Sequence, residues 1–546
     1  MKIALAQLNY IIGDFEYNTQ KSLNAIQDAR RRGADLVVFA ELSVCGYSPR
    51  DFLEFSEFIE LCERSASKIA AACTDIACII GLPIPNPGVH GKDLFNSAYF
   101  IEHGQVKAVV NKALLPNYDV FDEYRYFEPA VNFSCIDFMG HKIALTICED
   151  LWNINDNPMY TVCPMDDLIR EKPDLMINIA ASPFAYNHDE ERVRILGDNC
   201  RKYNLPLLYV NQVGAQTEII FDGGSLVFDK QGLLLDEMAY FSEDLRIYEY
   251  ENGKVKGTVP QVHDAQNDIQ QIHDALIIGI KDYFRKSGFT KAILGLSGGI
   301  DSALVCALAS EALGPENVMA VLMPSEYSTD HSIHDALELV KNLGCRHEII
   351  PIKEAASAFD SLLKPVFKDL PFNVAEENVQ ARSRAIIVMA MSNKFGYILL
   401  NTSNKSECAV GYGTLYGDMA GAIAVLGDVY KTQVYKLSHY INREKEIIPI
   451  NSILKPPSAE LRPGQKDSDS LPEYDILDAI LFQYIELKKS SSAIIEQGFN
   501  ETLVKKILRM VNLAEFKRNQ APPILRISPK AFGMGRRLPI VGKYLV

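Results

Sequence analysis

The sequence lacks most of the features that mark membrane-spanning and nucleic-acid-binding proteins. No apolar run approaches the roughly 20 residues that a bilayer-spanning helix needs, so no membrane partner is expected. Acidic residues outnumber basic ones by 70 to 55, which gives a formal net charge of −15. This acidic balance argues against a nucleic-acid partner.

Cysteine is present, but its spacing matches neither metal sites nor a disulfide framework. The 11 cysteines are scattered, include no Cys-x-x-Cys pair and show no zinc-ligand spacing. The first residues predict a strand directly and lack a signal-peptide cleavage pattern. We therefore expect reduced thiols and a cytoplasmic protein.

The chain of 546 residues is too long to fold around a single hydrophobic core. Together with the patterning, this length predicts two α/β domains, residues 1–260 and 261–546. Short apolar runs alternate with helical patterns in both halves, which is typical of buried strands. A charged, hairpin-like stretch at residues 243–256, followed by residues 257–260, marks the boundary. In the second half we expect a parallel, doubly wound sheet, with a mobile loop at residues 456–472.

The most informative stretch is Ser-Gly-Gly-Ile-Asp-Ser at residues 297–302, between an apolar strand and an apolar helix. A strand that turns through small residues onto a helix N-terminus leaves backbone N–H groups free to bind an anion. Asp301 would add a carboxylate for the Mg²⁺ that accompanies a nucleotide triphosphate. A glycine-rich turn of an ordinary α/β fold is the alternative, but the complete hexapeptide favours nucleotide binding. The predicted ATP contacts of this stretch are Gly295, Leu296, Ser297, Gly298, Gly299, Ile300, Asp301 and Ser302.

This loop lacks the Gly-Lys-Ser/Thr of a Walker A motif. It resembles instead the Ser-Gly-Gly-x-Asp-Ser signature of the ATP pyrophosphatases. The resemblance implies that ATP is cleaved between its α and β phosphates and that an oxygen of the second substrate is activated as an adenylate.

In the first half, three chemically reactive residues stand next to apolar strands. Glu41 and Cys148 each follow a strand, and Lys112 precedes a proline-containing loop. If the three meet, Glu41 serves as general base, Cys148 attacks a carbonyl carbon, and Lys112 stabilises the oxyanion and keeps Cys148 partly ionised. Taken singly, Cys148 is better explained as a buried apolar residue, Glu41 as a helix N-terminal residue and Lys112 as a solvated lysine.

The combination, over residues 1–240, resembles the Glu-Lys-Cys triad of the nitrilase superfamily, whose α/β sandwich hydrolyses amides and nitriles through a thioester. The segment at residues 116–127 is similar to the lysine-following segment of glutamine amide hydrolases in that superfamily. The resemblance also covers Ala-Ser-Pro-Phe at residues 181–184, and His188 stands where relatives often carry another basic residue. The glutamine-site residues implied by this resemblance are Tyr118, Glu123, Glu149, Ser182 and His188.

The motifs of the second half, over residues 268–518, resemble those of NAD synthetases in an ordered set. They include Glu-Asn-Val-Gln-Ala-Arg at residues 377–382, Asn-Thr-Ser-Asn-Lys-Ser-Glu at residues 401–407 and a basic pair at residues 517–518. The implied ATP contacts are Thr402 and Lys431, and the implied deamido-NAD⁺ contacts are Asn378, Arg382, Glu407 and Lys517. Asp301 and Glu407, on separate strand–helix turns, are the candidate Mg²⁺ ligands. A helix-surface pair of Glu377 with Arg382 and a solvated Lys517-Arg518 face are the alternatives.

Together the two resemblances imply a ligase in which ammonia released from L-glutamine amidates deamido-NAD⁺ after activation by ATP. The expected partners are then small molecules. The resemblance also implies that the chain forms a homo-oligomer, with an octamer as the expected form. Another amidotransferase and a binding protein with a dead amidase half are the alternatives. The NAD synthetase motifs argue against the first, and the complete Glu41-Lys112-Cys148 set argues against the second.

Overall fold

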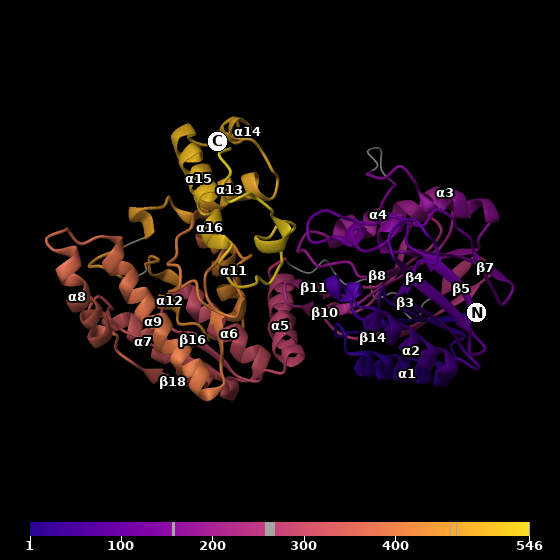
Figure 1. The fold of residues 1–546 in the computed structure, drawn as a ribbon, viewed down its shortest axis with the longest axis horizontal. Coiled ribbons are helices and arrows are strands. Elements are labelled where there is room, and N and C mark those ends of the chain that lie inside the picture. Colours follow the sequence, from indigo (N-terminus) through magenta and orange to yellow (C-terminus); the bar gives the residue numbers. More distant parts are fainter. Residues whose placement is uncertain (155–158, 257–267, 459, 466, 545–546) are drawn as a thin grey trace. The chain divides into compact units, whose positions relative to one another are not determined.

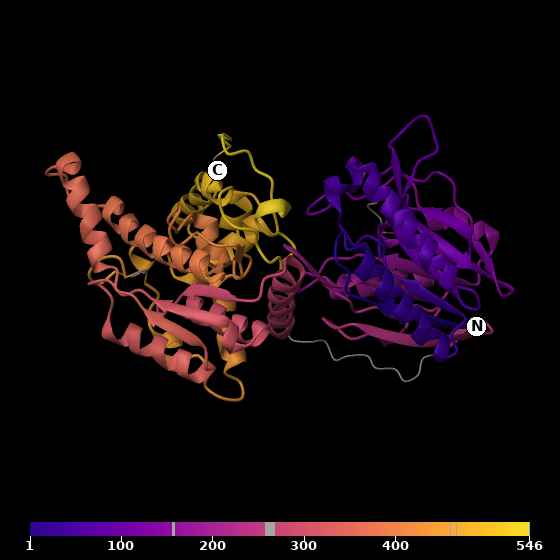
Figure 2. The ribbon, with the colours of Figure 1, turned by 60° about the horizontal axis from the view of Figure 1, so that its bottom comes forward.

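The computed structural model describes residues 1–154, 159–256, 268–458, 460–465 and 467–544. The chain divides into two compact units, Met1–Gln266 and Asn267–Val546, each with its own sheets (Figures 1 and 2). The domain boundary predicted within residues 257–261 lies outside the described residues. Across the part of the chain that is described, the helices are all too short or too polar to cross a membrane.

The amino-terminal unit consists of two stacked sheets with helices on the outside. The seven-stranded sheet has the order β15 (Lys254–Lys256), β14 (Asp244–Glu251), β1 (Lys2–Gln7), β2 (Leu36–Phe39), β3 (Ala77–Pro85), β4 (Leu94–Glu102) and β5 (Gln105–Asn111). The six-stranded sheet has the order β13 (Leu234–Glu237), β12 (Leu226–Phe228), β9 (Leu207–Asn211), β8 (Leu175–Ala180), β7 (His141–Ile147) and β6 (Ile136–Phe138). One continuous core contains residues of both sheets, among them Leu5, Val38, Leu145 and Ile177, which confirms the expected α/β sandwich.

Two helices cover the seven-stranded sheet, α1 (Phe15–Arg31) and α2 (Ser56–Ala72). Asp14 caps helix α1 by accepting a hydrogen bond from the Tyr17 N–H. On the six-stranded sheet, α3 (Pro164–Leu168) packs on β7 and α4 (Asp189–Tyr203) packs on β12. The charged stretch predicted as a hairpin is the antiparallel pair β14–β15, with the hairpin β10 (Val213–Gln216)–β11 (Ile219–Asp222) nearby in sequence.

The carboxyl-terminal unit contains a five-stranded, all-parallel sheet, as predicted. Its order is β18 (Arg346–Ile349), β17 (Val318–Leu322), β16 (Ala292–Gly295), β19 (Ile398–Asn401) and β20 (Ile423–Ala424). The strand order reverses direction at β16, so the carboxyl end of β16 is the topological switch point where ligands bind in doubly wound sheets.

The helices of this unit divide into a group around the sheet and a group near the C-terminus. Around the sheet lie α5 (Asp268–Ser287), α6 (Ile300–Leu313), α7 (Asp330–Leu343), α8 (Lys353–Phe367), α9 (Val374–Phe395), α11 (Lys431–Ile441) and α12 (Ile450–Leu454). A second core joins α10 (Lys405–Val410), α13 (Tyr474–Ile485), α14 (Ser491–Ile495) and α15 (Glu501–Leu513), and α16 (Glu515–Arg518) follows. The loop predicted at residues 456–472 is described except at residues 459 and 466, and it contains turns and one short 3-10 helix (Asp467–Asp469).

Candidate active sites

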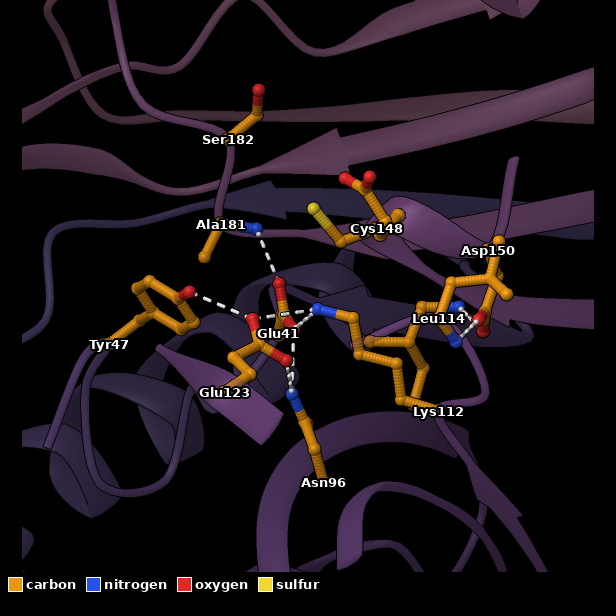
Figure 3. Close-up of polar contacts among 12 residues, drawn as sticks. Glu41, Tyr47, Asn96, Lys112, Leu114, Glu123, Cys148, Asp150, Ala181 and Ser182 are labelled. Atoms are coloured by element: carbon orange, nitrogen blue, oxygen red, sulfur yellow. Dashed lines mark hydrogen bonds and ion pairs between the residues drawn. The ribbon is translucent and has the colours of Figure 1, made fainter. Parts of the chain in front are cut away.

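In the amino-terminal unit, Glu41, Lys112 and Cys148 meet at strand ends of the two sheets. Glu41 follows β2 and Lys112 follows β5 in one sheet, while Cys148 follows β7 in the other. Figure 3 shows Glu41, Lys112 and Cys148 in one site, with the Cys148 sulfur pointing towards the Ala181–Ser182 segment. Their exposed fractions are 1%, 0% and 6%, which excludes the solvated-lysine interpretation of Lys112.

The Lys112 ammonium holds two carboxylates together at the base of this site. Its Nζ lies 2.7 Å from Glu41 Oε1 and 2.8 Å from Glu123 Oε1. Asn96 donates to Glu41 Oε1 at 2.7 Å, and the Tyr47 hydroxyl donates to Glu123 Oε1 at 2.8 Å (Figure 3). Burial lowers the pKa of Lys112, but Glu123 and Glu41 outweigh it, so the pKa lies well above its usual range. Lys112 is therefore a permanent cation.

Glu41 is fixed from a second side by the backbone that precedes Ser182. The N–H of Ala181 donates to Glu41 Oε2 at 3.0 Å, while Oε1 binds Lys112 and Asn96. Both oxygens thus have defined partners, so the carboxylate has a fixed orientation in the site.

The backbone at Cys148 has the left-handed conformation, with φ of 44°, at the start of a short 3-10 helix (Cys148–Leu151). A non-glycine residue in this region is strained and needs support from its surroundings. Asp150 supplies it, because one carboxylate oxygen accepts from the Ile147 N–H and the other accepts from the N–H groups of Ala113 and Leu114. The same side chain therefore ties the nucleophile's turn to the segment after Lys112.

The surroundings of Cys148 oppose the partial ionisation that was expected from Lys112. Burial raises the pKa of the thiol well above its usual range, and the Glu41 carboxylate adds to the rise. The Lys112 ammonium offsets only part of this effect, because it is already paired with Glu41 and Glu123. The arrangement suits attack in which Glu41 removes the thiol proton as the sulfur forms its new bond.

The residues expected around glutamine have hydrogen-bond partners outside the triad as well. Glu149 accepts hydrogen bonds from the Tyr118 hydroxyl at 2.9 Å and from the Tyr160 hydroxyl at 3.0 Å. Ser182 exchanges backbone hydrogen bonds with the Asn211 side chain, at the ends of β8 and β9. Burial raises the pKa of Glu149, with the Lys112 ammonium opposing the rise.

His188 lies against Trp152, with a ring-centroid distance of 5.2 Å and an interplanar angle of 4°. Trp152 immediately follows the short helix that starts at Cys148, so the stacking brings His188 to the nucleophile's side of the unit. Sequence reasoning missed Trp152, Tyr47, Asn96 and Tyr160. A signal was available for Trp152 alone, as the chain's single tryptophan beside the predicted nucleophile.

In the carboxyl-terminal unit, a cavity of about 500 Å³ opens at the carboxyl end of β16. It is lined by every predicted residue of the glycine-rich loop except Gly298, and by Thr402, Glu407 and Lys431. Gly298 has φ of +79°, and a Cβ there would lie 2.2 Å from the Ser332 carbonyl oxygen. This glycine lets the loop approach α7, whereas Gly299 begins the helix α6 whose first turn faces the cavity.

Asp301, Glu407 and Lys431 form the charged wall of this cavity. Lys431 Nζ contacts Asp301 Oδ2, and Asn404 donates to Asp301 Oδ1 at 2.9 Å. Burial raises the pKa of Glu407 well above its usual range, and the neighbouring Asp301 carboxylate adds to it. Two carboxylates facing one cavity suit a divalent cation that is also held by phosphates. Within the described ranges, no three His, Cys, Asp or Glu side chains gather as a protein-only metal site.

Asn378, Arg382 and Lys517 do not line the cavity but converge on residues 411–418 beside it. Thr414 donates to Asn378 Oδ1 at 2.7 Å, and Arg382 Nε donates to the Leu415 carbonyl at 3.1 Å. Lys517 Nζ donates to the carbonyls of Gly411 and Gly413 at 2.8 and 2.7 Å. Tyr412, Gly417 and Asp418 of the same stretch do line the cavity, so these side chains support its wall.

The alternatives weighed for these charged residues are wrong. Glu377 pairs with Arg462 at 3.6 Å, not with Arg382. Arg518 is 7% exposed and binds Glu515 and the carbonyls of Cys408 and Ala409, so the face is not solvated.

Lys405, inside the 401–407 motif, is fully buried, and its Nζ lies 2.8 Å from both Asp428 and Glu486. It stabilises the fold on the side of the motif that does not line the cavity.

Each unit matches a known class of enzyme. Residues 2–258 match the carbon-nitrogen hydrolase family, and residues 272–521 match the NAD synthase family. The chain therefore combines a carbon-nitrogen hydrolase with an NAD synthase.

Full-length relatives carry the same combination. The glutamine-dependent NAD(+) synthetase of Synechocystis sp. is 47% identical over 98% of both chains, and that of Acinetobacter baylyi is 41% identical over 99% of this chain and 98% of its own. The solved structure of the Acinetobacter baumannii glutamine-dependent NAD⁺ synthetase in complex with ADP is 38% identical, with a TM-score of 0.79 over 99% of this chain and 98% of the other. The chain belongs to the family of glutamine-dependent NAD(+) synthetases.

Proposed function

We propose that this protein makes NAD⁺ from deamido-NAD⁺, ATP and L-glutamine. The observation that carries the proposal is that one chain holds both a buried Glu41-Lys112-Cys148 site and a cavity at a parallel-sheet switch point. Membership of the family supports the pairing of the two activities. We assign glutamine hydrolysis to residues 1–260 and amidation to residues 261–546.

In the first site, the Cys148 sulfur attacks the side-chain amide carbon of glutamine while Glu41 takes the thiol proton. Lys112 stabilises the negative charge that develops on the amide oxygen. Glu41 then gives the proton to the departing ammonia, and it activates the water that cleaves the thioester to glutamate. The fixed hydrogen bonds of Glu41 support this double role, because the carboxylate needs no reorientation.

Around the substrate, Glu149 is placed to accept the glutamine ammonium, with Tyr118 and Glu123 shaping the same pocket. Ser182 lies at the end of β8, and we assign it and His188 to the amino-acid end of glutamine. The Trp152–His188 stack supports a defined position for His188.

In the second site, the pyridine carboxylate of deamido-NAD⁺ attacks the α-phosphate of ATP, pyrophosphate leaves, and ammonia then displaces AMP. The loop residues that line the cavity and the first turn of α6 offer backbone N–H groups to the phosphates. Lys431 balances charge as pyrophosphate departs. Thr402 contacts ATP, while Asn378, Arg382 and Lys517 hold the wall against which the dinucleotide lies.

Asp301 and Glu407 would hold Mg²⁺ in this site. The raised pKa of Glu407 beside the Asp301 carboxylate supports this assignment, because a cation between two buried carboxylates relieves their repulsion. Bound Mg²⁺ would supply additional neutralisation of the phosphate oxygens.

We also propose that the protein is a homo-oligomer, expected as an octamer, in the cytoplasm. No residue of α8 is buried, and the exposed fractions of Leu362 and Val366 on it are 72% and 70%. A second copy of the chain would cover this apolar face. Light scattering on the wild type and on a Leu362→Asp, Val366→Asp variant tests this, with a smaller species expected for the variant. All 11 cysteines are free thiols, which supports a reducing compartment.

The direct test of the reaction mixes the purified protein with deamido-NAD⁺, ATP, Mg²⁺ and either glutamine or ammonium, and follows NAD⁺ and AMP. We expect both products, in equal amounts, with either nitrogen donor. AMP without NAD⁺, or neither product, would mean that the ATP site activates a different acid.

A further inference from the structure

Arg384 is a cation of the nucleotide cavity whose hydrogen-bonding capacity is mostly unused. It lies on α9 and lines the cavity together with Ala381 and Ala385 of the same helix. Its Nε donates to the Met323 carbonyl, at the end of β17, at 3.1 Å. Within the described part of the chain its two terminal nitrogens have no hydrogen-bond acceptor, and no carboxylate oxygen lies within 4.0 Å.

The other cations that line this cavity are paired. Lys431 contacts Asp301, Lys455 lies 3.2 Å from Asp335, and Arg462 lies 3.1 Å from Asp469. Arg384 differs from them because it lines the cavity without a carboxylate partner among the described residues.

The nearest carboxylates that influence Arg384 are already engaged elsewhere. Glu460 Oε1 accepts hydrogen bonds from Thr329 and Ser332 at 2.9 and 2.7 Å. Asp418 Oδ1 accepts from the Thr414 backbone N–H at 2.5 Å. Burial lowers the pKa of Arg384 more than Glu460 and Asp418 raise it, yet a guanidinium stays charged in proteins. Arg384 is partly buried, and a partly buried charge without a counter-ion is stabilised by an anionic ligand that compensates its desolvation.

We propose that the two terminal nitrogens of Arg384 bind phosphate oxygens of ATP. A planar guanidinium fork matches two phosphate oxygens, and such charge-assisted pairs are among the strongest polar contacts in proteins. The hydrogen bond to Met323 anchors the side chain beside the strand adjacent to β16, at the wall of the cavity that Ser297 and Gly299 also line. This inference rests on the proposed function only in taking ATP as the nucleotide.

A phosphate ligand could also come from deamido-NAD⁺, whose two phosphates have the same chemistry. We assign Arg384 to ATP because Asn378, Arg382 and Lys517, three of the four side chains expected at deamido-NAD⁺, converge on residues 411–418. Arg384 is instead anchored at Met323. Separate binding measurements with each nucleotide distinguish the two sources.

The test compares Arg384→Met, Arg384→Lys and the wild-type full-length protein by calorimetric titration with ATP, adenosine and deamido-NAD⁺ in the presence of Mg²⁺. Lys394→Met is the matched control, because Lys394 is an exposed cation of the same helix that does not line the cavity. We expect Arg384→Met to weaken ATP binding by about 10- to 100-fold, with Arg384→Lys recovering part of the loss. Adenosine and deamido-NAD⁺ binding should change by less than about 3-fold, and Lys394→Met should match the wild type.

Three results would overturn the proposal. Equal weakening of ATP and adenosine would show that Arg384 acts on the base, the ribose or the fold. Unchanged ATP affinity would show that the fork does not contact it, and weakening of deamido-NAD⁺ alone would assign Arg384 to the other nucleotide. If the wild type binds ATP but forms no NAD⁺, the proposed function fails, while the comparison of ATP with adenosine still decides the role of Arg384.

Discussion

Cys148, the proposed nucleophile, lies in surroundings that oppose its ionisation. The thiol is buried and faces the Glu41 carboxylate, and both effects raise its pKa. A site of this kind does not store a thiolate but generates it only when substrate is present, which protects the sulfur from adventitious electrophiles.

This interpretation predicts opposite changes in reactivity and catalysis for Glu41→Gln. The substitution removes a carboxylate that raises the pKa of Cys148, so the thiol should react faster with iodoacetamide near neutral pH. Glutaminase activity should nevertheless fall by about 10²- to 10⁴-fold, because the general base is lost. Peptide mass spectrometry at Cys148 and a glutamate assay measure the two effects. Slower alkylation of the variant would contradict the pKa argument, and retained glutaminase activity would remove Glu41 as the base.

At the same scale, the sequence predicted the positions of the triad but not the protonation state of its thiol. Glu41 and Cys148 each follow an apolar strand, which marks both as residues at strand ends. The two strands belong to different sheets, so their meeting depends on how the sheets stack and not on either strand alone. The Cys148 pKa depends on how Lys112 divides its charge between Glu41 and Glu123, which only the assembled site determines. Asn96 and Arg384 escaped prediction for the same reason, because nothing local distinguishes them from ordinary strand and helix residues.

At the scale of elements, the ends of β9, α4 and β11 are joined by a buried network behind Ser182. Arg192 on α4 makes two hydrogen bonds to Asp222 on β11, at 3.0 and 2.7 Å. Asp222 in turn accepts from Asn211, whose side chain binds the backbone of Ser182 at 2.9 Å. The network connects a buried ion pair to the segment assigned to glutamine.

We predict that Asp222→Ala lowers the free energy of unfolding by about 3–5 kcal/mol, because it leaves the Arg192 charge buried and unpaired. Asp198→Ala is the matched control, since it removes a surface partner of Arg201 and should cost at most about 1 kcal/mol. Chemical denaturation followed by near-ultraviolet circular dichroism measures both. Equal stability of the two variants would show that the buried pair does not stabilise this unit.

Helices α5 and α6 are linked by a histidine whose charge should make stability depend on pH. His273 lies 2.8 Å from Asp274 and 3.1 Å from Glu311. Burial lowers its pKa, but hydrogen bonds to the two carboxylates outweigh this and raise the pKa from 6.5 to about 9. Protonated His273 therefore stabilises the folded protein fully below pH 6.5, and this contribution to the free energy of unfolding is lost as the pH rises through 9.

His273→Gln should therefore destabilise the protein more at about pH 6 than at about pH 10, by up to about 3 kcal/mol. Thermal denaturation of the wild type and the variant at both pH values measures the difference. If the melting temperatures of the wild type and the variant differ by the same amount at both pH values, the raised pKa of His273 is contradicted.

The elements themselves could largely be predicted from the sequence. The apolar runs at residues 2–8 and 36–40 contain the strands β1 and β2, and the charged stretch contains the hairpin β14–β15. These elements could be predicted because runs of apolar residues give a clear local signal. The sheet order could not be derived from any single run. It depends on pairing between distant strands, such as β1 with β14, for which local sequence carries little information.

At the scale of the whole molecule, two chemistries with one shared intermediate lie on a single chain. Ammonia is mostly protonated near neutral pH, and ammonium is not a nucleophile, so transfer shielded from water would favour the second reaction. We propose such transfer as the reason for the fusion. Release of most of the ammonia into solution during glutamine-driven turnover would contradict it.

The central claim, two separable sites working in series, is tested most directly by comparing nitrogen donors in two variants. Cys148→Ala should lose glutamine-driven NAD⁺ synthesis by at least about 10³-fold while ammonium-driven synthesis stays within about 3-fold of the wild type. Asp301→Ala should lose synthesis with both donors and keep measurable glutaminase activity. Equal loss of both syntheses in Cys148→Ala, or ATP-dependent synthesis that survives in Asp301→Ala, would contradict this division of the molecule.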